Sequence, residues 1–195
     1  CVVLTRSDVV LKMAYIAWMT NDIRLREELC TYLPALESYN RASYIGIVLA
    51  RTESKVEQEY VLQSLGDRSA DIRDEAYKVL SEMSLSPEQY QHIEELLRFK
   101  YSEMRINAIN LLMKQPEAQL AASIRRLLSD KNAERRLAGL DMMKSIRNVD
   151  FLKDSYQKLL STVREIQKPN AKEKILIESL IGDGTEQSPT SNYTR

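Results

Sequence analysis

The chain has 195 residues, of which 44% are hydrophobic and 29% are charged, a balance typical of a globular protein and unlike that of a disordered or membrane-embedded chain. Lys and Arg together match Asp and Glu at 28 each, so the net charge indicates no strongly charged partner. One His and two Cys are too few for a disulfide framework, a Cys/His zinc cluster or a His-based catalytic centre. Five Gly and five Pro favour helices over turn-rich β structure.

Apolar residues recur at steps of three and four along nearly the whole chain, which predicts a succession of amphipathic helices and no strand. Pro87, Pro116 and Pro169 fall at the expected boundaries between helices. The last residues, 183–195, lack this periodicity, and we expect a flexible tail or linker there. The predicted helices span 7–20, 22–33, 41–51, 53–66, 70–83, 87–99, 102–115, 117–129, 132–147, 150–167 and 170–182.

An internal repeat organises these helices. Arg73, Arg105 and Arg136 are spaced by 32 and 31 residues. A small residue follows each Arg by three positions and an apolar pair by six and seven: Ala76, Ala108 and Gly139, then Val79-Leu80, Leu111-Leu112 and Met142-Met143. The series continues backward to Arg41 with Ile47-Val48, and forward to Lys174 with Leu180-Ile181. Two helices per period of this length predict an α-solenoid, in which each helix pair stacks on the next.

The segment 127–140 resembles a HEAT repeat of the armadillo-type superfamily, which has an Asp in the turn between its two helices and an Arg early in the second helix. Asp67 with Arg73 and Asp130 with Arg136 match that pattern, six residues apart each time, whereas Phe99 takes the place of the Asp before Arg105. The resemblance implies an all-α, right-handed superhelical solenoid over residues 1–182, with about five helix pairs and one leading helix. It also implies a structural ladder between repeats formed by Asp67, Arg73, Arg105, Asp130 and Arg136.

The leading helix, 7–20, would be the second helix of a repeat, with no first helix before it in the sequence. Its apolar character is not that of a polar capping repeat, so we expect a piece of a longer protein with further chain or a membrane anchor before Cys1. A mature lipoprotein also begins with Cys, which is the alternative to an excised fragment. No run of 18 apolar residues occurs, so we expect no membrane insertion within this chain, and a cytoplasmic location is favoured although the compartment stays open.

The sequence contains no Gly-rich phosphate loop or nucleophile motif, so we expect no catalytic residue, metal ligand or cofactor. A fold of this kind specifies function weakly. We expect a noncatalytic protein–protein interaction scaffold that binds another protein on its extended curved surface. Positions two, five and nine after each anchor should face outward on that surface: Glu75, Lys78, Glu82, Asn107, Asn110, Lys114, Ala138, Asp141 and Ser145.

Two other functions stay open. Basic residues gather between 125 and 147 and would suit phosphate contacts with nucleic acid, made by Arg125, Arg126, Lys144 and Arg147. Acidic residues are interspersed among them, which favours an ion-paired surface. The third function is a regulatory or spacer module of a larger enzyme. A separate apolar set either packs against adjacent repeats, as we expect, or forms a partner patch: Ile106, Ile109, Met113, Leu137 and Leu140.

Overall fold

The computed structural model of the chain describes residues 5–182. All regular secondary structure in that range is helical, with eleven α-helices and two 3-10 helices, and the all-α prediction is therefore confirmed. Contacts within the chain define two compact units, Cys1–Ile93 and Glu94–Arg195, whose boundary falls inside α6 (Pro87–Leu96). The predictions about Cys1 and about the tail 183–195 lie outside the described residues. The single continuous array stays a prediction.

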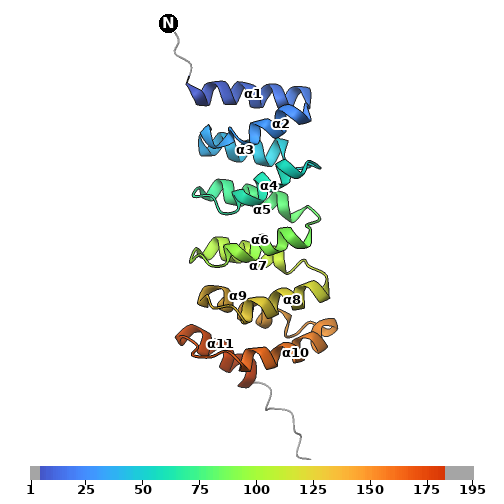
Figure 1. Cartoon of the computed structure of the whole chain (residues 1–195), viewed down its shortest axis with the longest axis vertical. Helices are drawn as coiled ribbons and strands as arrows, with labels where there is room; N and C mark the ends of the chain where they lie inside the picture. The colour runs from blue at the N-terminus through green and yellow to red at the C-terminus, as the bar shows by residue number, and fades with distance from the viewer. Residues whose placement is uncertain (1–4, 183–195) are drawn as a thin grey trace, which may run out of the picture. The chain divides into compact units, whose positions relative to one another are not determined.

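Unit 1 is a stack of helices in which second helices of successive repeats lie side by side (Figure 1). α3 packs along α5, α2 packs along α4, and α4 packs against α5. α1 rests chiefly on α2 and on the short helix η1, and contacts α3 less closely. The bounds are α1 (Arg6–Thr20), α2 (Ile23–Cys30), η1 (Leu33–Ala35), α3 (Ser38–Val48), α4 (Lys55–Ser64) and α5 (Ala70–Ser81).

Unit 2 repeats this arrangement. α8 packs along α9, α10 packs on α8, and α11 packs on α9. Gly139 permits the first of these contacts, because a Cβ there would lie 3.1 Å from Leu127 Cβ and 3.2 Å from Leu128 Cδ2. The bounds are α7 (Ser102–Leu112), α8 (Glu117–Leu128), α9 (Ala133–Ile146), η2 (Asp150–Leu152), α10 (Lys153–Arg164) and α11 (Ala171–Gly182).

Local signals account for where the helices begin and end. Thr5 and Asp8 form a capping box at the start of α1, and the side chain of Asp22 accepts hydrogen bonds from the first N–H groups of α2. The predicted helix 22–33 ends earlier, at Cys30, because Pro34 lies in the 3-10 helix η1, where it removes a backbone donor. The predicted helix 150–167 likewise opens with a separate 3-10 turn, η2.

The repeat positions form the core of each unit. The apolar pairs that follow Arg73, Arg105 and Arg136 are all buried, and so are the small residues Ala76, Ala108 and Gly139. The repeat that begins at Arg41 departs from this pattern, since Tyr44 stands at the small-residue position and Ile47 is 65% exposed. Tyr44 and Ile47 both line the hollow described next.

Candidate functional site

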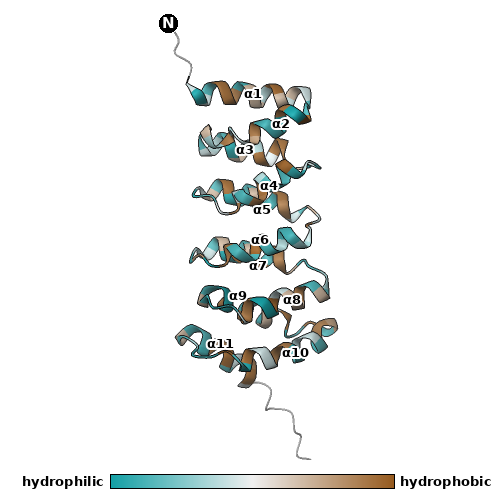
Figure 2. Ribbon diagram, viewed as in Figure 1, coloured by the Kyte–Doolittle hydropathy of each residue, from teal (hydrophilic) through white to brown (hydrophobic). Residues whose placement is uncertain are grey.

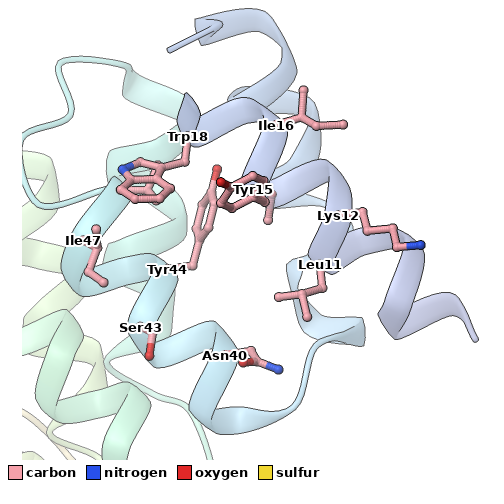
Figure 3. A pocket seen from close by; sticks show the side chains of 11 residues that line it. Leu11, Lys12, Tyr15, Ile16, Trp18, Asn40, Ser43, Tyr44 and Ile47 are labelled. Atoms are coloured by element: carbon pink, nitrogen blue, oxygen red, sulfur yellow. The ribbon is translucent and has the colours of Figure 1, made fainter. Parts of the chain in front are cut away.

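An apolar hollow of about 660 Å³ opens between α1 and α3 in unit 1 (Figure 3). Leu11, Tyr15 and Trp18 line it from α1, at the spacing i, i+4, i+7 that places side chains on one helix face. Tyr44 and Ile47 line it from α3. Four of these side chains are open to solvent: Leu11 is 43% exposed, Tyr15 59%, Trp18 49% and Ile47 65%. The hollow is therefore an open groove and not a closed cavity.

Tyr44 is a departure from the repeat at the hollow. Three other second helices, α5, α7 and α9, have Ala or Gly three residues after the anchor Arg, and Gly139 of α9 allows the close approach of α8. The buried ring of Tyr44 takes that position in α3. In the same helix Ile47, at the repeat position of the buried Val79, is exposed.

Aromatic side chains give the hollow a defined surface. The rings of Tyr15 and Trp18 meet edge to face, with centroids 5.9 Å apart and an interplanar angle of 63°. Tyr44 is only 6% exposed, and its hydroxyl is buried without a hydrogen-bond partner among the described residues. Burial, reinforced by the carboxylate of Glu57, raises the pKa of Tyr44, so this hydroxyl stays protonated.

A polar hollow adjoins the apolar one and shares Trp18 and Ile47 with it. Its floor is a buried ion pair, in which Arg26 Nε and Nη2 donate to Glu57 Oε1 and Oε2 at 2.8 Å each. The hydroxyl of Thr52 also donates to Glu57, and Arg26 Nη1 donates to Asn21 Oδ1 at 2.7 Å. With these bonds made, the pair serves to join α2 to α4.

The one free thiol described in the structure, Cys30, is buried beneath these groups. Burial, with the carboxylates of Glu57 and Glu27, raises its pKa to about 12, which leaves it protonated and a poor nucleophile. The site thus combines apolar walls and aromatic rings with an adjoining buried ion pair.

The residues predicted to face a partner do not form one free surface. In unit 1, Glu75 Oε1 accepts from Lys78 Nζ at 2.6 Å, and the Glu75 carboxylate lies directly over Gly46 of α3, while Glu82 is exposed at the end of α5. In unit 2, Asn107 is half-buried and Asn110, Lys114 and Ser145 are exposed. The prediction for Ala138 is wrong, because it is fully buried within α9. Asp141 accepts from Arg105 and is therefore part of an ion pair.

The apolar set on α7 and α9 is divided. Leu137 and Leu140 are buried and Ile109 and Met113 are half-buried, as packing between repeats requires, whereas Ile106 is 57% exposed. These residues therefore form no continuous apolar patch.

The basic region 125–147 is largely neutralised by ion pairs within unit 2. Arg126 Nη2 and Nε donate to the buried carboxylate of Glu94 at 2.6 and 3.1 Å, which raises the pKa of Arg126. Arg135 pairs with Asp130 at 3.0 Å and with Glu95 at 3.1 Å. Arg125 and Lys144 are exposed, and Arg147 Nη1 donates to the carbonyl of Ser179 at 3.3 Å. Fewer cations are left for phosphate than the sequence suggests.

The predicted ladder residues occupy matching positions in the two units. Arg73 Nη1 donates to the carbonyls of Asp67 and Arg68 at 2.9 and 3.0 Å. Arg136 Nη1 does the same to Asp130 and Lys131 at 2.9 and 2.8 Å. Each Arg thereby closes the turn that precedes its own helix.

The turn aspartates order the turn ahead of the helix that follows them, by accepting from the N–H of its N-cap residue. Asp67 Oδ1 accepts from the N–H of Ser69 at 2.8 Å, and Asp130 Oδ1 accepts from the N–H of Asn132 at 2.7 Å. Asp67 also pairs with Arg41, which comes from the preceding repeat. The turn carboxylate therefore both orders its own repeat and contacts the one before it.

Three further ion pairs join successive repeats of unit 2. Arg105, which lacks a turn Asp, pairs with Asp141 and with Glu134. Arg136 Nε donates to the fully buried Glu173 at 2.8 Å. Lys174, the expected anchor, is instead exposed, because its neighbour Glu173 is the residue that points inward and accepts this bond.

Two absences apply to the part of the chain that the structure describes. Within residues 5–182, no helix is long and apolar enough to cross a membrane. The same range holds no group of three or more His, Cys, Asp or Glu side chains placed to bind a metal ion.

Within each unit, helix pairs stack on one another and ion pairs join successive repeats, which is the all-α, HEAT-like repeat architecture that the sequence predicts. Residues 1–193 match the model described as "Family of unknown function (DUF5724)", and the chain belongs to this family. A solved structure with a similar backbone is that of the archaeal HEAT-like repeats protein from Thermococcus onnurineus NA1. It is 16% identical, covers 97% of this chain and 93% of its own, and gives a TM-score of 0.44. No curated protein matches the sequence.

Proposed function

We propose that this chain is a noncatalytic scaffold that binds a partner protein through the apolar hollow between α1 and α3. The observation that supports the proposal is the exposure of Leu11, Tyr15, Trp18 and Ile47 around one concave surface. Single exposed apolar residues are common on proteins, but contiguous ones around a hollow mark interaction sites. Polar residues at its edge, Asn40 among them, complete the apolar centre and polar rim of a typical interface.

The proposal shifts the expected interface away from the polar residues of α5, α7 and α9. Glu75 and Asp141 already serve ion pairs, and a partner would have to break these contacts to use them. Trp18 and Tyr15, by contrast, offer large rigid surfaces that lose little conformational entropy on binding.

A pull-down from the native host's lysate tests the proposal, with three forms of the chain as bait. The wild type is compared with Trp18→Ser and with Phe151→Ser, a matched control in which a 73% exposed aromatic residue is removed from unit 2. Each lysate is divided into nuclease-treated and untreated halves, and the fold of each bait is checked by far-UV circular dichroism.

We expect the wild type and Phe151→Ser to retain the same protein, with and without nuclease, and Trp18→Ser to lose it. Equal retention by all three baits would refute a site at the hollow. Recovery that disappears with nuclease would refute protein binding and would point instead to the exposed cations Arg125 and Lys144.

A further inference from the structure

We propose that the occupant of the hollow is an amphipathic α-helix of the partner, with apolar side chains at i, i+4 and i+7 and a carboxylate beside them. This inference rests on the proposed function and specifies what the hollow would bind. Three features of unit 1 support it, which are the repeat pattern, the dimensions of the hollow and its charge.

The repeat pattern indicates a helix as the occupant. Val79 of α5 stands at the same repeat position as Ile47, and packing within the unit reduces its exposure to 4%, against 65% for Ile47. Leu111 and Met142, at the same position of their repeats, are fully buried. A surface that helix packing buries elsewhere in the solenoid is left open here, so a helix supplied by a partner would complete the contact.

The dimensions of the hollow fit two turns of helix. Leu11 and Trp18 are seven residues apart, which corresponds to about 10 Å along the helix axis. An incoming helix with three apolar anchors over two turns would place them between α1 and α3, in the helix-in-groove mode of recognition. Figure 2 shows hydrophobic residues along most of α1, as in helices that are covered on more than one face.

The charge at the rim selects an acidic helix. Among the eleven described residues that line the hollow, Lys12 alone carries a charge, and it lies at the rim (Figure 3). A second copy of this chain fits less well, because its own α1 would bring another Lys12 to the same groove. A small molecule fits less well too, because so open a groove cannot enclose most of its surface.

Trp18 makes the test specific to the site, since it is the only tryptophan in the chain. The probes are three synthetic helical peptides of about 18 residues. The first has Leu at i, i+4 and i+7 with Glu beside them, the second replaces each Glu with Lys, and the third replaces each Leu with Ala. Each is titrated into the full chain while the Trp18 emission is recorded, up to about 1 mM peptide.

We expect the Leu/Glu peptide to shift the Trp18 emission to the blue and to saturate. The Leu/Lys peptide should bind about fivefold more weakly, the difference expected for one exposed charge contact, and the Ala peptide should have no effect. Lys12→Glu should reverse the preference between the first two peptides. Lys131→Glu, a charge reversal at an exposed residue of unit 2, is the matched control and should leave the preference unchanged.

Three outcomes would overturn the inference. No Trp18 response to the Leu/Glu peptide would exclude a helical occupant of this kind. Equal binding of the Glu and Lys peptides would exclude selection by Lys12. A blue shift that grows with the concentration of the chain alone, with a dimer in sedimentation, would identify a second copy as the occupant. If no peptide binds but the pull-down still depends on Trp18, the proposed function stands and only the acidic helix is refuted.

Discussion

Removing the Glu57 carboxylate should destabilise unit 1 severely. The Glu57 side chain is 1% exposed, both of its oxygens accept from Arg26 at 2.8 Å, and the Arg26 side chain is itself only 11% exposed. Glu57→Ala would therefore leave a buried guanidinium without its counter-charge, which costs about 3–5 kcal/mol. Urea denaturation followed by Trp18 emission measures this directly, because Trp18 lies in the same unit.

A double substitution separates the ion pair from the packing around it. Arg26→Met with Glu57→Leu removes both charges and keeps most of the volume, so we expect its stability to approach or exceed that of the wild type. Lys78→Ala is the control for loss of an exposed pair and should leave the unfolding midpoint unchanged. A loss below about 1 kcal/mol for Glu57→Ala would refute the reasoning, since it would mean that water reaches the pair and screens it.

Three further predictions concern other parts of the chain. Gly139→Ala should destabilise unit 2 by about 1 kcal/mol in urea denaturation, because crowding of α8 exceeds the helix-propensity gain, and an unchanged midpoint would contradict this. In a Cys1→Ser background, Cys30 should resist Ellman's reagent at about pH 8 until urea unfolds the chain, and rapid labelling of the native protein would show that the thiol is accessible. Hydrogen bonds at the start of α1 lower the pKa of Asp8, so its stabilisation of the helix should be present at neutral pH and disappear below about pH 4. The loss can be followed as a change in Trp18 emission on acidification, and Asp8→Asn should make that change smaller.

Periodicity predicted the helices well because most of them bury one face against a neighbour. The apolar pairs after Arg73, Arg105 and Arg136 are buried in the structure, and the all-helical class follows from them. The ends were less predictable, since they depend on local backbone geometry. Lys168 adopts φ = 49° and turns the chain ahead of α11, although nothing in its side chain favours that left-handed conformation.

Ion pairs between distant positions were not predictable from spacing alone. The register placed Lys174 as the last anchor, but the neighbouring Glu173 accepts from Arg136, because burial of a carboxylate requires a cationic partner. Arg126 in the same way appears free in the sequence and is paired with Glu94, 32 residues earlier. Which charges pair depends on how successive repeats pack, and the sequence of a single repeat does not specify that packing.

The candidate site was missed for a different reason. Offsets from the anchor Arg assume that all repeats pack alike, and they direct attention to polar side chains such as Glu75 and Asn107. The signal that marks the hollow is a departure from the repeat, with Tyr44 where α5, α7 and α9 have Ala or Gly. A second signal is that apolar residues occupy both the buried and the exposed faces of α1, which contact of the exposed face with water does not require.

The ion pairs and the hollow together indicate which surface is available to a partner. Arg26, Arg126 and Arg136 each bind a buried carboxylate of another helix, so their charge stabilises the stack and is not offered to a ligand. Binding through these groups would weaken the contacts between repeats. Binding at Trp18 and Ile47 would remove exposed apolar surface from water and break no ion pair, so it would add stability to unit 1. A partner that binds the hollow should therefore raise the unfolding midpoint of wild-type unit 1, and the same partner should leave Trp18→Ser unchanged.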